Sequence, residues 1–166
     1  MGKVVSQSDL ILHRSEWKRN GKRVVFVSGT FDLLHPGHVR LLEQARDLGD
    51  VLVVGVLTDA AVHELSKTQK ASSDEPARPI TPAAERMEIL AALAAVDFVV
   101  ECEEPVPSKL AARLNPDIIA EGAASRPTAQ STGIERHPAG KTFRAIPLEP
   151  GYSTSELIKR IKQPHA

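Results

Sequence analysis

Short apolar runs alternate along the chain with stretches whose apolar residues recur every three or four positions. The continuous runs predict buried strands at residues 24–28, 51–57, 98–100, 117–120 and 141–146. Helical spacing predicts helices at residues 39–48, 59–65, 81–93, 108–114 and 153–161. This alternation is typical of the α/β class, and we expect a Rossmann-like fold in which helices flank both faces of a parallel sheet. Such sheets bind ligands at the carboxyl ends of their strands.

The pattern divides the chain into a short leading segment and one domain. Residues 1–21 are expected to form an extra helix or arm, and residues 22–166 a single domain of ordinary size with a buried core. Residues 66–79 are polar, as in a loop, and residues 123–139 have no clear period because Gly, Pro and Thr interrupt them.

Composition narrows the classes of function. The chain has 21 Lys plus Arg and 21 Asp plus Glu, so it lacks the basic excess typical of proteins that bind nucleic acid. Its apolar runs are too short to span a bilayer, and residues 1–12 lack the apolar core of a signal peptide. The single cysteine, Cys102, has no partner for an intrachain disulfide. We therefore expect a cytoplasmic protein with no nucleic-acid or membrane partner, in which Cys102 is a packing thiol.

The most informative stretch is residues 28–38, Ser-Gly-Thr-Phe-Asp-Leu-Leu-His-Pro-Gly-His, which joins a predicted strand to the following helix. Gly29 allows the backbone to turn tightly or to approach a ligand. Pro36 suits the first position of a helix, where its missing N–H costs nothing. Gly37 removes a side chain where a phosphate would meet the unpaired amides of the helix start. The segment is therefore a candidate phosphate site.

His35 and His38 lie three residues apart, so both imidazoles can face one point above the start of that helix. Imidazole N–H groups, helix amides and a cation together stabilise the charge that develops when an α-phosphate is attacked and pyrophosphate departs. An isolated His-x-x-His pair is more often two unrelated histidines or half of a metal site. Its place between strand and helix, behind a Gly-Thr-Phe-Asp turn, favours catalysis here.

The block from Gly29 to His38 resembles the signature of the cytidylyltransferase-like HxGH nucleotidyltransferases. The chain is more closely similar to the D-glycero-β-D-manno-heptose 1-phosphate adenylyltransferases, over residues 21–161 or so. Further matching segments are residues 37–43, 45–50, 78–80, 85–87, 89–100 and 150–155. The HxGH block is specific for the superfamily, and the other segments point to the subgroup.

The resemblance implies transfer of a nucleoside monophosphate from a nucleoside triphosphate to a small phosphorylated acceptor, with release of pyrophosphate. ATP and a sugar phosphate similar to heptose 1-phosphate are favoured. The alternatives are CTP with a polyol phosphate such as glycerol 3-phosphate, and a nucleotide-binding module without turnover. Mg2+ is expected through the nucleotide phosphates, without a metal site on the protein. A homodimer is expected because relatives are often dimers.

The resemblance and the local patterns together indicate site residues. The catalytic candidates are His35, His38 and Lys67, a loop lysine favoured over Lys70. Nucleotide contacts are expected from Gly29, Thr30, Phe31, Gly37, Arg86, Gly122, Tyr152, Ser153 and Thr154. Contacts with the acceptor are expected from Asp32, Arg78 and Glu121.

Some of these residues also have a purely structural interpretation. Ser153 and Glu156 make a capping box, which would explain the serine without a ligand. Asp32 can accept backbone hydrogen bonds in its turn instead of approaching the acceptor or a metal-bound water. Arg86 either reaches the triphosphate or lies on a solvated helix face. Arg78, which precedes a proline and leaves a polar loop, suits a phosphate clamp.

The chain departs from the heptose enzymes at three places. Residues 28–30 read Ser-Gly-Thr where those enzymes usually have Asn-Gly-Cys, which is closer to the glycerol-phosphate cytidylyltransferases. The loop at residues 66–77 is longer than their compact Lys-Gly segment. Residues 120–125 read Ala-Glu-Gly-Ala-Ala-Ser where relatives usually have Lys-Gly-Gly-Asp-Tyr, so Glu121 reverses a charge beside an anionic substrate. Base preference and acceptor identity therefore stay open on the sequence.

Overall fold

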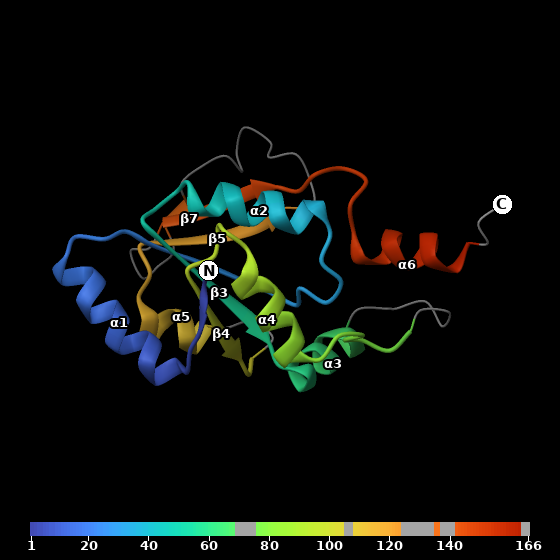
Figure 1. The fold of residues 1–166 in the computed structure, drawn as a ribbon, viewed down its shortest axis with the longest axis horizontal. Helices are drawn as coiled ribbons and strands as arrows, with labels where there is room; N and C mark the ends of the chain where they lie inside the picture. Colours follow the sequence, from blue (N-terminus) through green and yellow to red (C-terminus); the bar gives the residue numbers. More distant parts are fainter. Residues whose placement is uncertain (69–75, 105–107, 124–134, 137–141, 164–166) are drawn as a thin grey trace.

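The computed structural model describes residues 1–68, 76–104, 108–123, 135–136 and 142–163. Within these ranges seven strands form one sheet in the order β1-β4-β3-β2-β5-β7-β6 (Figure 1). The strands are β1 Lys3–Val4, β2 Val24–Gly29, β3 Val51–Leu57, β4 Phe98–Cys102, β5 Ile118–Ala123, β6 Glu135–Arg136 and β7 Thr142–Pro147. Neighbouring strands pair in parallel, except that the short β6 runs antiparallel to β7. The expected α/β class is confirmed.

Helices cover both faces of this sheet. They are α1 Gln7–Arg19, α2 Pro36–Arg46, α3 Asp59–Thr68, α4 Ala83–Ala92, α5 Ser108–Leu114 and α6 Thr154–Lys162. Side chains alternate along β3, so Leu52 and Val54 pack with residues of α2 and α4 on one face. Val51 and Val53 pack with residues of α1, α3 and α5 on the other face. Burial on both faces is the reason why this strand is an uninterrupted apolar run.

Strand β2 is the point from which the chain continues in both directions across the sheet. β3 and β4 follow on one side of β2, whereas β5 and β7 lie on the other side. Such a switch leaves a crevice at the carboxyl ends of the two strands concerned, here β2 and β5. The HxGH segment starts where β2 ends, so the fold places the motif at this crevice.

The leading segment contributes an edge strand, β1, and helix α1. Arg14 of α1 is 9% exposed, and its guanidinium donates to the carbonyls of Leu114 and Asn115. It also pairs with Asp117, whose carboxylate accepts from the N–H of Val24 at the start of β2. Helix α1 is thereby tied to the sheet at the end opposite the crevice.

The two helices next to the crevice begin in different ways. α2 begins at Pro36 with His35 as the N-cap, which confirms that the proline occupies the first helical position, although the apolar spacing indicated a helix only from residue 39. α4 begins at Ala83 rather than at residue 81, and its N-cap residue, Pro82, makes no side-chain capping bond. The Ala83 N–H, at the start of α4, donates instead to Oδ1 of Asp59 at 2.9 Å, a residue 24 positions earlier. Asp59 belongs to α3, so tertiary contact supplies the cap.

Cys102, at the end of β4, packs against β3. It is 2% exposed, and a Cβ added at Gly55 would lie 2.6 Å from its Sγ. Burial, reinforced by the carboxylates of Glu101 and Glu104, raises the pKa of this thiol to about 12. The interpretation of Cys102 as a packing residue is confirmed.

No helix in the described part of the chain has both the length and the apolar character needed to cross a membrane.

Candidate active site

The crevice at the carboxyl ends of β2 and β5 is a cavity of about 820 Å3. Its walls come from segments far apart in the sequence: the β2–α2 turn, α2, α3, the residues before α4, the end of β5 and the start of α6. The predicted site residues among its lining are Gly29, Thr30, Phe31, Asp32, His38, Arg78, Gly122 and Thr154. The fold therefore brings together a large part of the set that the sequence indicated.

The other predicted residues are not part of the lining: His35, Gly37, Lys67, Arg86, Glu121, Tyr152 and Ser153. Lys67 is exposed in the last turn of α3, and Lys70 lies outside the described residues. Successive side chains of a strand point to opposite faces, so Glu121 is exposed on the face opposite to that of its neighbour Gly122. The roles of Lys67 and Glu121 stay predictions without support from the geometry.

The two motif histidines lie face to face at the start of α2. Their ring centroids are 3.8 Å apart, with 20° between the ring planes. His38 lines the cavity, whereas His35 is 8% exposed and lies behind it as the N-cap residue. The rings therefore converge on the start of the helix, but of the two only His38 reaches the cavity wall.

Both imidazoles are neutral at neutral pH. Burial lowers the pKa of His35, and burial together with the adjacent His35 lowers the pKa of His38 to about 4. In each ring Nδ1 is buried and has no hydrogen-bond partner among the described residues. A neutral imidazole has one N–H donor and one acceptor nitrogen. His38 can thus donate a hydrogen bond to an anionic oxygen in the cavity without being charged itself.

Gly37 provides the space that this stack needs. A Cβ added at Gly37 would lie 3.0 Å from Nδ1 of His35 and 3.1 Å from Cβ of Tyr152. The Tyr152 ring in turn lies 6.3 Å from the ring of His35. The guanidinium of Arg40 lies 5.6 Å from the centroid of Tyr152 and 2.8 Å from Oε2 of Glu149. These contacts hold the segment before α6 against the start of α2.

Helix α6 brings its own amino end to the same cavity. The Glu156 N–H donates to Oγ of Ser153 at 3.1 Å, which confirms the capping interpretation of Ser153. Thr154 and Ser155, the first residues of the helix, line the cavity. Figure 1 shows α6 beyond a long segment that follows β7, at the end of the molecule opposite to α1. The first turns of α2 and α6 thus both contribute to one cavity, α2 through His38 and α6 through Thr154 and Ser155, an arrangement that favours an anion.

The turn between β2 and α2 contains a strained residue, and it is Phe31 rather than the glycine expected to allow the turn. Phe31 has φ +49°, in the left-handed region that bulky residues rarely adopt. Its ring meets that of His38 edge-on, with the centroids 5.5 Å apart. A Cβ added at Gly29 would lie 3.1 Å from the Phe31 ring. Gly29 therefore gives room to the phenylalanine instead of making the turn itself.

Asp32 binds the segment that precedes α4. It is 5% exposed, and its Oδ1 accepts from the N–H groups of Ile80 and Thr81, each at 2.8 Å. Its Oδ2 pairs with Nη1 of Arg78 at 3.1 Å. The prediction that Asp32 accepts backbone hydrogen bonds is confirmed, but the donors lie 48 and 49 residues away rather than in its own turn. Arg78 is the one Lys or Arg among the described lining residues.

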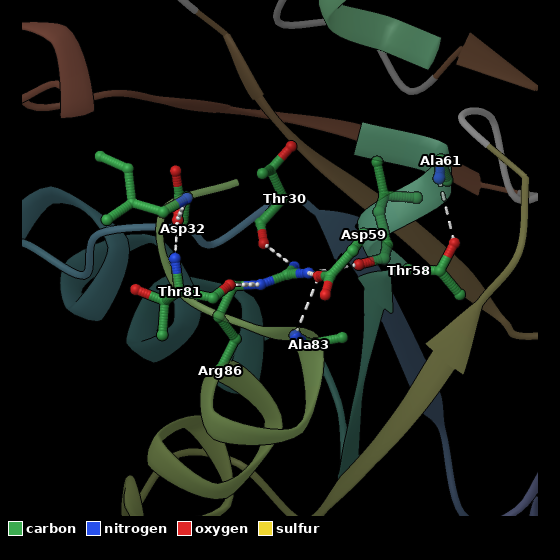
Figure 2. A network of polar contacts seen from close by, with 10 residues as sticks. Thr30, Asp32, Thr58, Asp59, Ala61, Thr81, Ala83 and Arg86 are labelled. Carbon is green, nitrogen blue, oxygen red and sulfur yellow. Dashed lines mark hydrogen bonds and ion pairs between the residues drawn. The ribbon is translucent and has the colours of Figure 1, made fainter. Parts of the chain in front are cut away.

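Arg86 is buried, so its predicted alternative, a solvated helix face, is wrong. The side chain is 1% exposed and extends from α4 toward the β2–α2 turn (Figure 2). Nε donates to the Thr81 carbonyl at 2.8 Å, and Nη1 donates to the Thr30 carbonyl at 2.5 Å. Nη2 donates to the Leu57 carbonyl at 2.9 Å and to Oδ1 of Asp59 at 2.6 Å. Arg86 binds the backbone around the cavity instead of lining it.

Part of the lining was missed by the sequence patterns. These residues are Ser28, Leu41, Val62, Leu65, Ser66, Pro76, Ala77, Leu148 and Ser155. Helical spacing identified Val62 and Leu65 as apolar positions, but it does not tell which part of an apolar face opens into a cavity. Ser155 could have been predicted, because it follows Ser153 and Thr154 directly at the start of α6.

Comparisons with known proteins agree with the fold and with the motif. The family model described as Cytidylyltransferase-like matches residues 26–160. Two proteins named Bifunctional protein HldE, from Edwardsiella ictaluri and Koribacter versatilis, are 38% identical over 160 residues and 40% identical over 158 residues. These matches cover 96% and 95% of this chain but 32% and 31% of the relatives, so the chain spans about a third of their length.

A solved structure is similar over a comparable length. The crystal structure of the lipopolysaccharide core biosynthesis protein from Thermoplasma volcanium GSS1 is 26% identical and superposes with a TM-score of 0.57. The superposition covers 78% of this chain and 98% of that protein. The family match extends from β2 to α6 and includes every segment that lines the cavity. The chain therefore belongs to the cytidylyltransferase-like family of nucleotidyltransferases.

Proposed function

We propose that this chain transfers AMP from ATP to a sugar phosphate similar to heptose 1-phosphate and releases pyrophosphate. The observation that carries the proposal is that the first turns of α2 and α6 line one cavity, through His38 and through Thr154 and Ser155. Helix amino ends bind phosphate groups through N–H groups and the helix dipole. The names of the relatives, Bifunctional protein HldE and a lipopolysaccharide core biosynthesis protein, support an acceptor from carbohydrate metabolism.

In this proposal the protein acts by positioning and by stabilising charge. The α2 and α6 amino ends hold the triphosphate, and the His38 N–H donates to a phosphoryl oxygen as negative charge develops there. Arg78, held by Asp32 in the cavity wall, offers a guanidinium to the acceptor phosphate. Holding the two reactants in line supplies a large part of the rate enhancement, and no covalent intermediate is needed.

Mg2+ enters this proposal bound to phosphate oxygens of the nucleotide. Among the described lining residues Asp32 is the one carboxylate, and its oxygens already accept from Ile80, Thr81 and Arg78. The described ranges contain no group of three or more His, Cys, Asp or Glu side chains able to hold a metal ion. The donor set of the cavity thus fits a cation carried in by the triphosphate, where it would offset phosphate charge.

The negative charge of Glu121 is expected to repel an anionic substrate less strongly than the sequence suggested. Glu121 is exposed and outside the cavity lining, whereas Gly122 contributes to it. CTP with a polyol phosphate is the second candidate. It is favoured by the Ser-Gly-Thr sequence at residues 28–30, because Ser28 and Thr30 both line the cavity.

The test is pyrophosphate release by the whole chain with Mg2+, using ATP or CTP and a panel of sugar 1-phosphates and polyol phosphates. We expect release with ATP and a sugar 1-phosphate, and none when the acceptor is omitted. Release only with CTP and glycerol 3-phosphate would establish the second candidate. Nucleotide binding without turnover on any acceptor would contradict transfer and leave a binding module. Light scattering of the same sample tests the expected homodimer.

A further inference from the structure

Arg86 joins backbone segments that are distant in the sequence and that surround the cavity. Figure 2 shows its guanidinium among the β2–α2 turn, the junction between β3 and α3, and the residues that lead into α4. Its partners are the carbonyls of Thr30, Leu57 and Thr81 and the carboxylate of Asp59. A guanidinium has five N–H donors in a rigid plane, so one side chain can bind these separate acceptors at once.

The bond to Thr30 reaches the peptide unit that precedes Phe31. The Thr30 carbonyl belongs to this peptide unit, so its direction is coupled to the left-handed φ of Phe31. Such a conformation is unfavourable for a bulky residue and persists only when surrounding contacts hold it. On the other side of Phe31, Asp32 is bound to the N–H groups of Ile80 and Thr81. The strained residue is therefore fixed from both sides, by Arg86 of α4 on one side and by the segment that leads into α4 on the other.

The orientation of Phe31 matters for His38, because the two rings are in edge-on contact in the cavity wall. We propose that Arg86 is a positioning residue for nucleotidyl transfer: it fixes the peptide before Phe31 and thereby holds the Phe31 ring against His38. The kinetic consequence rests on the proposed function, whereas the effect on the geometry of His38 does not. Arg86 itself touches no substrate in this assignment.

The first measurement follows the His38 imidazole by NMR as a function of pH, in the whole chain without nucleotide. The signal is identified by its loss in His38→Gln. Burial holds the pKa of His38 at about 4 in the native chain. In Arg86→Lys we expect this pKa to rise toward its ordinary value, because an ammonium cannot reach all four acceptors and a released Phe31 exposes His38 to water. A shift in this direction supports the proposal.

Arg14→Lys is the matched control. Arg14 is also buried, also binds two backbone carbonyls and an aspartate, but it lies at the opposite end of the sheet. Both substitutions lower the stability of the fold, so a general loosening would move the His38 titration in both variants. We expect a shift in Arg86→Lys alone. Equal shifts in the two variants would overturn a specific positioning role.

The second measurement compares ATP affinity and turnover in the same variants. We expect Arg86→Lys to lower kcat by about tenfold or more, the scale of losing a charge-assisted hydrogen bond. The dissociation constant for ATP should change less, because the α2 and α6 amino ends remain in place. Wild-type chain that releases no pyrophosphate would contradict the proposed function, whereas an unchanged His38 titration in folded Arg86→Lys would overturn the role of Arg86.

Asp59→Ala provides a milder variant if Arg86→Lys does not fold by circular dichroism. Its side chain is 45% exposed and binds both Nη2 of Arg86 and the Ala83 N–H, so the substitution removes one bond to Arg86 and the cap of α4 but no buried apolar contact. We expect a smaller shift of the His38 pKa in the same direction. An unchanged titration in Asp59→Ala, with Arg86→Lys unfolded, would reduce Arg86 to a stabilising residue and overturn the proposal.

Discussion

The imidazole ring of His35 lies on that of His38, with the centroids 3.8 Å apart and 20° between the planes. Two imidazolium rings at this distance would repel each other, and burial disfavours a charge on either of them. The contact therefore depends on neutral rings, in agreement with the lowered pKa values of both. His38 faces the cavity with the properties of a hydrogen-bond donor rather than those of a cation.

The stability of the fold should fall as the pH decreases through the range where His38 titrates in the unfolded chain. The pKa of His38 is 6.5 when unperturbed and about 4 in the native state, so below about pH 6.5 the unfolded chain binds a proton that the native chain does not. We expect the free energy of unfolding, measured with urea, to decrease from about pH 6.5 to about pH 4. His38→Gln should lose part of this decrease. The exposed His63 is the control, and an identical slope in His38→Gln and His63→Gln would contradict the prediction.

Replacement of the motif histidines should affect turnover far more than folding. We expect His38→Ala to lower kcat by about 100-fold or more, the usual effect of removing a donor that stabilises charge in the transition state. His35→Ala should also lower kcat, because it removes the ring that packs on His38. Circular dichroism checks that both variants are folded, and His63→Ala should turn over normally. Near-normal rates in the two motif variants would refute their roles.

Gly37→Ala should damage the site without breaking α2. The added methyl group would lie 3.0 Å from Nδ1 of His35 and 3.1 Å from Cβ of Tyr152, so one of these side chains has to move. Alanine is favoured over glycine in a helix by about 1 kcal/mol, which offsets part of the strain. We expect a loss of turnover of about tenfold or more with little change in thermal stability. Gln44→Ala, on the exposed side of α2, is the control. Unimpaired turnover in Gly37→Ala would show that the contact is not needed.

The contact between Arg40 and the segment before α6 should matter for nucleotide affinity and little for stability. Arg40 and Glu149 are 46% and 40% exposed, and such pairs contribute at most about 1 kcal/mol to folding. They hold Tyr152 in place, however, and Thr154 in the cavity wall follows two residues later. We expect Arg40→Ala and Glu149→Gln to weaken ATP binding several-fold, as measured by calorimetry. Lys22→Ala removes another exposed pair, with Asp50, and should leave affinity unchanged.

An equal loss of affinity in Lys22→Ala would attribute the effect to net charge rather than to the position of α6. Unchanged affinity in both Arg40→Ala and Glu149→Gln would show that α6 keeps its place without this contact. Comparison of the two single variants distinguishes the two interactions of Arg40, because Glu149→Gln loses only the pair with Glu149, whereas Arg40→Ala also loses the contact with Tyr152.

The secondary structure was accessible from the sequence because it depends on local periodicity. The strand at residues 51–57 and the helix at residues 108–114 have the predicted bounds. Burial on both faces makes the strand a continuous apolar run, and the helix repeats its apolar residues every three or four positions. The HxGH segment was equally readable, because its proline and glycine have positional preferences at a helix start. The place of the motif followed from the expected parallel sheet, because such sheets bind ligands at the carboxyl ends of their strands.

The direction and partners of polar side chains were decided by tertiary structure alone. Neither the pairing of Asp32 with Arg78 nor the cap that Asp59 provides for α4 has a local signal, because the partners are 46 and 24 residues apart. The same holds for Arg86. Periodicity placed it on a helix but did not show which way its side chain points, and the structure buries it among four acceptors. A sequence determines which segments can fold and which chemical groups they carry. Which groups meet depends on how the sheet and its helices bring separate turns together, because buried polar atoms must find partners there.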